Sequence, residues 1–234
     1  KAYWNATEKA LYLYDGSNLP SSIWSPNASN DTLPGLTFDM DVTVVGSAGT
    51  NSFNLNIDRA GYYYRGDWTM DLKGGNDSLN SAKLKDADSI DMGAGDDTVY
   101  VMLSGTNGTP ALGSANITKL DGGAGTDTLA FTESTVADGS TLTLTTANAT
   151  NFENLIGADT DVTLNGDNNA NTIKGGRGTD TINGNGGNDI LVANGNNLAG
   201  ADTSSSKNDN LYGGAGNDTL NGTAGDNILD GGTG

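Results

Sequence analysis

Glycine recurs at an interval of nine residues in the second half of the chain, and this spacing restricts the fold more than any other feature. The two series are Gly157, Gly166, Gly175 and Gly184, followed by Gly213, Gly222 and Gly231. The most regular copies, at 175–182 and 213–220, read Gly-Gly-x-Gly-x-Asp, then a hydroxyl residue and an aliphatic residue. A unit this short cannot bury its apolar side chain alone, so successive copies must stack into a solenoid.

Three looser copies precede this region, at 70–79, 90–99 and 120–129. Each has an apolar residue, an aspartate, a glycine-rich turn, a second aspartate, a hydroxyl residue and an aliphatic residue. The first aspartates are Asp71, Asp91 and Asp121, and the second ones are Asp77, Asp97 and Asp127. The intervals of 20 and 30 residues between copies indicate coils that carry insertions on one side.

The composition excludes several classes of function. The 234 residues include no His and no Cys, which rules out disulfides, zinc fingers and Ser-His-Asp catalysis. A formal net charge of −18 argues against binding to nucleic acid and to anionic lipid. No apolar stretch approaches the length that membrane insertion needs. Only Glu8, Glu133 and Glu153 of the 29 acidic residues are glutamates, and they show no spacing typical of a paired-acid enzyme.

The repeated turn combines residues that favour a hard cation. Glycines allow the backbone to curl its carbonyl groups toward one point, and aspartate adds a short carboxylate to the same cup. Such a cup contains oxygen ligands alone, and a flexible cage of oxygens selects Ca²⁺ over the smaller, strictly octahedral Mg²⁺. The sequence therefore predicts several bound calcium ions.

The repeat resembles the GGxGxDxUx nonapeptide of the RTX family, which residues 175–183 and 213–221 match in full. The resemblance implies an all-β fold, a right-handed parallel β-roll or β-solenoid with Ca²⁺ between turns 18 residues apart. It also implies the sixth-position ligands, which are Asp180, Asp189 and Asp218, with Asp77, Asp97 and Asp127 in the looser copies. Asn171 and Asn227 replace this aspartate and are expected to weaken their sites, and Lys73 replaces a glycine.

Asp71, Asp91 and Asp121 precede the glycine turns in the first half only. We expect each of them to add a carboxylate to the calcium site of its turn. The alternative is an aspartate that merely favours the turn.

Composition predicts three regions. Residues 1–69 form an aromatic-rich, non-repetitive β region, merged with irregular calcium-binding coils at 70–156. Residues 157–234 form the nonapeptide roll, which we expect to be truncated at its C-terminus because the chain stops within a repeat. The chain is thus expected to be a monomeric module of a longer protein.

Resemblance to RTX proteins implies type I secretion from a Gram-negative bacterium and a place outside the cell. The aromatic region makes the chain look like the ligand-binding region of a large RTX adhesin, which binds a peptide, a protein terminus or a glycan on a target cell surface. The expected contact residues are Arg59, Tyr62, Tyr63, Tyr64, Arg65 and Trp68, since arginine holds carboxylates and aromatic rings supply rigid contact area. The alternatives are aromatic side chains that only fill the core, a carbohydrate-binding module, and a structural spacer that binds only calcium.

Overall fold

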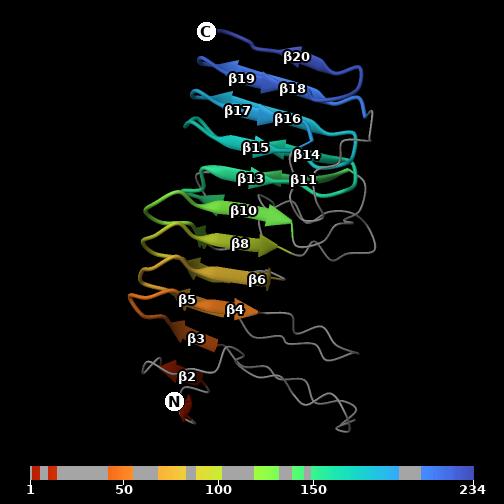
Figure 1. Ribbon diagram of the computed structural model, residues 1–234. Coiled ribbons are helices and arrows are strands. Elements are labelled where there is room, and N and C mark those ends of the chain that lie inside the picture. The colour runs from red at the N-terminus through yellow and green to blue at the C-terminus, as the bar shows by residue number, and fades with distance from the viewer. Residues whose placement is uncertain are drawn as a thin grey trace, which may run out of the picture.

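The protein is an elongated stack of short coils, and the regular elements of its described residues are all β-strands (Figure 1). The computed structural model describes residues 2–5, 10–14, 42–54, 68–82, 88–101, 119–131, 139–144, 149–194 and 207–234. All but one of the strand pairings within these residues are parallel, the exception being β1 (Ala2–Asn5) with β2 (Ala10–Tyr14). The prediction of an all-β parallel solenoid is confirmed.

One sheet of eight strands, the common sheet, runs along most of the solenoid. In chain order it consists of β4 (Ser52–Asn54), β6 (Ser78–Ala82), β8 (Thr98–Val101), β10 (Thr128–Phe131), β13 (Asn154–Ile156), β15 (Thr172–Lys174), β17 (Ile190–Val192) and β19 (Thr219–Asn221). Because every coil contributes one strand to this sheet, the irregular and the regular halves form one continuous stack.

Two further sheets face the common sheet in succession. The N-terminal sheet contains β1, β2, β3 (Val42–Val45), β5 (Trp68–Asp71), β7 (Ser89–Asp91), β9 (Lys119–Asp121) and β12 (Ala149–Thr150). The C-terminal sheet contains β11 (Ser140–Thr143), β14 (Val162–Asn165), β16 (Thr181–Gly186), β18 (Asn210–Ala215) and β20 (Ile228–Asp230). One coil contains both β11 and β12. Its β12 is the last strand of the N-terminal sheet, and its β11 is the first strand of the C-terminal sheet.

The core is a set of aliphatic rows, one residue per strand. The central residue of each short strand points inward, so that in the common sheet Leu79, Val99, Leu129, Leu155, Ile173 and Leu191 are fully buried. Parallel pairing in register places each of them on the equivalent residue of the next coil, as with Leu155 on Ile173. The alternation of one apolar residue between two polar ones therefore builds these rows. Leu72, Met92, Phe131 and Phe152 complete the core outside them.

The polar partners of these aliphatics form outward rows of threonine and asparagine. In the C-terminal sheet, the Asn165 amide donates to Thr143 Oγ1 at 2.8 Å, and the Asn183 amide donates to Asn165 Oδ1 at 2.6 Å. Identical spacing of the coils lets such side chains pair from strand to strand. The high content of threonine and asparagine thus stabilises the stack on its outer face.

The solenoid includes residues that precede the expected boundary at residue 70. β3 pairs with β5 and β4 pairs with β6, both in parallel, so 42–54 already form a coil. The turn of this coil, 46–51, repeats the pattern with Gly46, Gly49 and Asn51 in its first, fourth and sixth positions. This copy lacks the adjacent pair of glycines, and its interval of 26 residues to Asp77 hid it in the sequence.

Candidate metal centre

Most of the glycine-rich turns share one backbone conformation, which occurs in both halves of the chain. Their second and fourth residues have positive φ, for example 100° and 140° at Gly93 and Gly95, and 104° and 134° at Gly214 and Gly216. Only glycine adopts these angles without strain. Lys73 and Asn185 nevertheless occupy the second position, with φ of 73° and 74°. The irregular turns are thus built like the regular ones.

The sixth-position side chains stack into two columns, one at each end of the strands of the common sheet. The first column contains Asn51, Asp77, Asp97, Asp127, Glu153, Asn171, Asp189 and Asp218, and the second contains Asp180, Asp209 and Asn227. One oxygen of each acidic side chain accepts the backbone N–H of the equivalent residue in the preceding coil. The N–H of Asp97, for instance, donates to Asp127 Oδ1 at 2.7 Å.

The second carboxylate oxygen of these aspartates is buried and has no hydrogen-bond partner. This holds for Oδ2 of Asp77, Asp97, Asp127, Asp180, Asp189, Asp209 and Asp218. In the regular turns the oxygen lies where the first residue of the turn would carry its Cβ, so Gly175, Gly184 and Gly213 must be glycine. A buried oxygen without a donor is costly, and seven in two columns indicate that a cation belongs in these turns.

Electrostatics lead to the same conclusion. Burial raises the pKa of Asp127 and of Asp180 to about 7 and that of Asp189 to about 6, against the partly compensating hydrogen bonds from backbone N–H groups. Neighbouring carboxylates add to the effect, since Asp97 and Glu153 raise the pKa of Asp127 further. Burial also raises the pKa of Asp77, Asp97 and Asp209. Columns of carboxylates this close need protons or cations.

Calcium fits the residues present. The polar side chains in the two columns are all carboxylates or amides, which offer oxygen atoms as metal ligands. The carbonyl groups of the turns supply the remaining oxygens that Ca²⁺ prefers. Among the described residues no three acidic side chains gather into a metal cluster of their own. The ligands of each ion would therefore be one carboxylate per turn together with backbone carbonyls, and bound Ca²⁺ would neutralise the columns and lock adjacent coils together.

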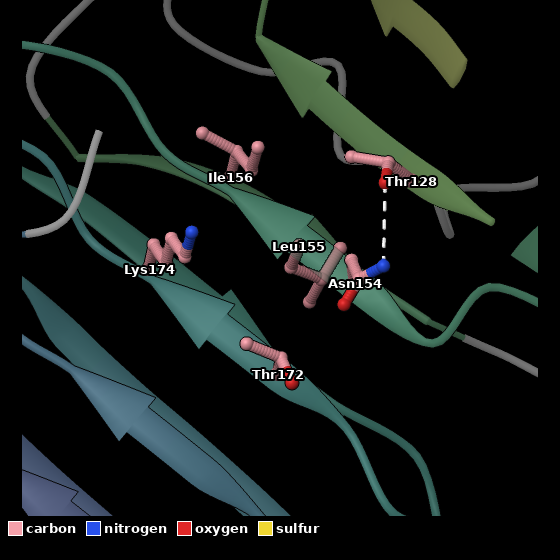
Figure 2. A pocket seen from close by; sticks show the side chains of 6 residues that line it. All are labelled: Thr128, Asn154, Leu155, Ile156, Thr172 and Lys174. Atoms are coloured by element: carbon pink, nitrogen blue, oxygen red, sulfur yellow. Dashed lines mark hydrogen bonds between the residues drawn. The ribbon is translucent and has the colours of Figure 1, made fainter. Parts of the chain in front are cut away.

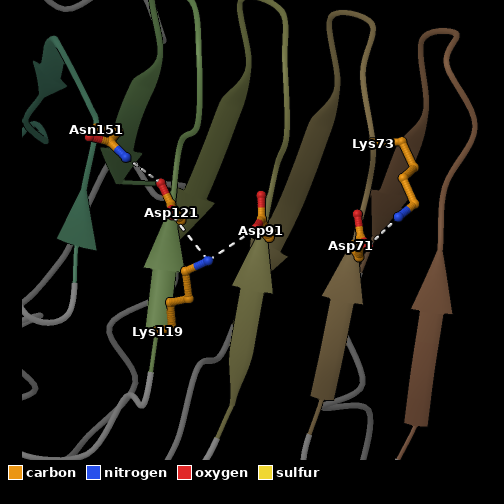
Figure 3. Close-up of polar contacts among 6 residues, drawn as sticks. All are labelled: Asp71, Lys73, Asp91, Lys119, Asp121 and Asn151. Carbon is orange, nitrogen blue, oxygen red and sulfur yellow. Dashed lines mark hydrogen bonds and ion pairs between the residues drawn. The ribbon is translucent and has the colours of Figure 1, made fainter.

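Asp71, Asp91 and Asp121 lie elsewhere, in a row at the ends of β5, β7 and β9 (Figure 3). Asp71 pairs with Lys73 at 2.5 Å, and the Lys119 ammonium lies 3.0 Å from Asp91 and 3.1 Å from Asp121. Asp121 also accepts the amide of Asn151 at 2.7 Å, and these contacts lower its pKa despite partial burial. Their partners here are lysines and an amide, and the structure does not bring these carboxylates to the oxygens in the turn columns.

Three residues of the columns escaped the sequence reasoning. Asp209 has no glycine pair before it in the sequence, although Asp209-Asn210-Leu211 keeps the end of the motif. Glu153 is the last residue of a turn of only three residues between β12 and β13, and its longer side chain reaches the N–H of Asp127 at 2.7 Å. Asn51 lies in the coil that the sequence did not reveal.

The predicted ligand-binding residues are described in part. Arg59, Tyr62, Tyr63, Tyr64 and Arg65 lie outside the described residues. Trp68, the first residue of β5, is half-buried and packs against the hydrophobic core. This packing favours the alternative that the ring of Trp68 stabilises the fold.

A small groove of about 170 Å³ lies on the common sheet, and its lining contains no residue of the turns. Figure 2 shows its lining side chains, which come from β10, β13 and β15. They are Thr128, Asn154, Leu155, Ile156, Thr172 and Lys174, with the Asn154 amide donating to Thr128 Oγ1 at 3.3 Å. The lining contains one ammonium group and no carboxylate, so the groove is separate from the metal turns.

A parallel solenoid in which seven of the stacked turns hold a buried, unpaired carboxylate oxygen defines a class of calcium-binding repeat protein. Residues 163–197 and 199–234 match the family model of the RTX calcium-binding nonapeptide repeat. This part of the chain is therefore an RTX repeat region, and RTX nonapeptide repeats bind Ca²⁺. The matched segments cover less than a third of the chain, and no curated protein and no solved structure matches it.

Two general properties of RTX repeats concern their activity and their export. RTX repeats are typically structural, calcium-binding elements without catalytic activity, and they are characteristic of proteins that Gram-negative bacteria export by type I secretion. Within the described residues, no helix is long and apolar enough to cross a membrane.

Proposed function

We propose that this chain is a calcium-dependent, extracellular ligand-binding module of an RTX adhesin, without enzymatic activity. The observation that carries the calcium part is the set of seven buried Asp Oδ2 atoms that have no donor. It extends the calcium sites beyond the matched repeats, because Asp77, Asp97 and Asp127 belong to turns of the irregular half.

Calcium then acts as a switch for folding. Extracellular calcium modules work at roughly 10⁻⁴–10⁻³ M Ca²⁺, far above the level inside a cell. Without the ion, the carboxylate columns oppose stacking of the coils, and with it each column becomes a source of stability. The module would thus be exported unfolded and fold at the cell surface.

The ligand-binding part of the proposal rests on topology. The parallel strands β4, β6, β8 and β10, which precede the connections to β5, β7, β9 and β11, all have their C-terminal ends on the same side of the common sheet, opposite the turns of the first column. The turns of the first column are short and similar, whereas these connections differ in length and in sequence. The segment with Arg59, Arg65 and the three consecutive tyrosines belongs to the first of them. Connections of variable sequence between the strands of a rigid stack suit recognition of a surface peptide or glycan.

The calcium part is tested by thermal unfolding followed by circular dichroism, in Ca²⁺, in Mg²⁺ and in EGTA. We expect a large increase in melting temperature in millimolar Ca²⁺ and little increase in Mg²⁺. An unchanged melting curve after chelation would refute it.

The ligand part is tested on peptide and glycan arrays in millimolar Ca²⁺. The variant carries Tyr62→Ala, Tyr63→Ala and Tyr64→Ala together, and the control is Tyr212→Ala, which removes a partly exposed tyrosine of β18. Loss of binding in the triple variant but not in the control supports the proposal. Binding that survives the triple substitution would remove the role of this segment.

A structural spacer is the second candidate function. The unbroken common sheet and the packing of Trp68 against the core favour it, because both connect the aromatic region to the solenoid. A chain that folds with Ca²⁺ and binds no array member would support the spacer and refute the adhesin module.

A further inference from the structure

Three described turns carry asparagine at the sixth position, where most of the other turns carry aspartate and the turn 157–162 carries Val162. They are Asn51 in the turn 46–51, Asn171 in 166–171 and Asn227 in 222–227. Asparagine has the shape of aspartate, but one of its two terminal atoms is a nitrogen that donates hydrogen bonds. This one difference changes what the turn can hold.

The amide of Asn227 fills its own turn. Its Nδ2 donates to the carbonyl oxygens of Gly222, Ala224 and Gly225, at 3.4 Å for the last two. Its Oδ1 accepts the N–H of Asp209 at 2.7 Å, as a carboxylate does in the same column. Three carbonyl oxygens of one turn thus converge on the end of the sixth side chain, and in this turn they meet a donor.

Asn51 repeats the arrangement in the other column. Its Nδ2 donates to the carbonyl oxygens of Gly49 and, at 3.5 Å, of Ser47, and also to Asp77 Oδ1 at 2.9 Å. Both amide turns therefore use the carbonyl of the fourth residue, Gly49 or Gly225. Neither side chain has a buried polar atom without a partner.

Asn171 is satisfied with the amide reversed. Its Oδ1 accepts the N–H of Asp167 within the turn at 2.9 Å, and its Nδ2 lies 3.5 Å from the carbonyl oxygen of Phe152 in the adjacent coil. All three asparagines thus leave no unpaired oxygen in their turns, in contrast to the seven aspartates.

We infer that the sixth residue selects between a cation and an amide, and that the turns 46–51, 166–171 and 222–227 hold together without calcium through their own asparagine. A carboxylate beside converging carbonyls offers acceptors only, so the turn needs a cation. In the turns 46–51 and 222–227 an amide nitrogen at that point donates to the same carbonyls and leaves no acceptor for the cation. In the turn 166–171 the amide oxygen accepts a backbone N–H of its own turn instead. The inference rests on the proposed calcium function and narrows it, because it exempts two turns of the matched repeats, 166–171 and 222–227, from binding calcium.

The test converts one amide turn into a carboxylate turn by Asn227→Asp. The matched control is Ala224→Asp, which adds the same charge to the same turn at an exposed position. Bound Ca²⁺ is counted by native mass spectrometry and by isothermal titration calorimetry with CaCl₂. We expect Asn227→Asp to bind one more ion than the wild type and Ala224→Asp to bind the same number as the wild type. An unchanged ion count in Asn227→Asp, or an equal gain in the control, would overturn the inference.

Melting in EGTA separates this inference from the calcium function itself. Asn227→Asp replaces a donor by an acceptor beside three carbonyls, so its melting temperature in EGTA is expected to fall below that of Ala224→Asp. This comparison involves no ion. A wild type that binds no Ca²⁺ would refute the proposed function, whereas equal melting of the two variants in EGTA would refute the role of the asparagine.

Discussion

Replacing Asp180 by asparagine is expected to change stability in opposite directions with and without calcium. Asp180 is fully buried, its Oδ1 accepts the N–H of Val162 at 3.0 Å, and its Oδ2 has no partner. Asparagine keeps the first hydrogen bond and removes the charge. In the calcium-free protein the substitution therefore removes a penalty, and in the calcium-bound protein it removes a ligand.

The magnitude follows from the pKa. Burial raises the pKa of Asp180 from 3.8 to about 7, and each pKa unit corresponds to about 1.4 kcal/mol. Keeping this carboxylate ionised in the calcium-free fold at pH 8 thus costs about 4 kcal/mol. Because the folded pKa is raised, the carboxyl group favours the fold at acidic pH, and this contribution disappears as the pH rises through 7. The gain from Asp180→Asn should accordingly be large at pH 8 and small at pH 5.

The assay is urea unfolding followed by circular dichroism, at pH 8 and pH 5 in EGTA and at pH 8 in millimolar Ca²⁺. Trimethylamine N-oxide brings a weakly stable calcium-free chain into the measurable range. The control is Asp226→Asn, which makes the same chemical change at an exposed residue. Destabilisation by Asp180→Asn in EGTA at pH 8, or a gain of equal size at pH 5, would refute the reasoning.

Three further predictions follow from the columns, the core and the turns. Calcium binding should release protons near pH 6–7. The reason is that Asp127 and Asp180, with pKa values of about 7, and Asp189, with a pKa of about 6, must lose any bound proton when calcium binds. The binding enthalpy measured by calorimetry should therefore vary with the ionisation enthalpy of the buffer. Glu153→Asp should destabilise by about 1–2 kcal/mol in denaturant unfolding, since the shorter side chain loses the N–H of Asp127, while Glu153→Gln should be nearly neutral. Lys73→Gly should be about 1 kcal/mol more stable than Lys73→Ala in the same assay, because Lys73 has φ of 73°; equal stability would show that this residue is not strained.

Much of the fold was predictable because the repeat is local. A turn of six residues and a strand of three contain the glycines, the aspartate and the inward aliphatic that define one coil, as at 213–221. Stacking follows from these residues alone. The coil at 42–54 and the residue Asp209 were not predictable in this way, since their turns lack the glycine pair and only pairing with neighbouring strands reveals them.

The residues of the candidate site were likewise predictable only in part. Asp77, Asp97 and Asp127 occupy the sixth position in the sequence and the first column in the structure. Asp71, Asp91 and Asp121 align equally well in the sequence, yet their side chains end beside Lys73, Lys119 and Asn151. Alignment cannot tell these two sets apart, because it does not say to which side of a strand or turn a carboxylate points.

The spacing of glycine and aspartate is thus enough to predict a parallel solenoid with oxygen-lined turns and a preference for calcium. The folded chain alone shows which oxygens lack a donor, because that depends on the backbone N–H groups of the adjacent coil. It shows for the same reason that Glu153 joins the first column and that Asn51, Asn171 and Asn227 close their turns with an amide. A residue type specifies which groups are available, and the contact with the next coil decides whether they are satisfied.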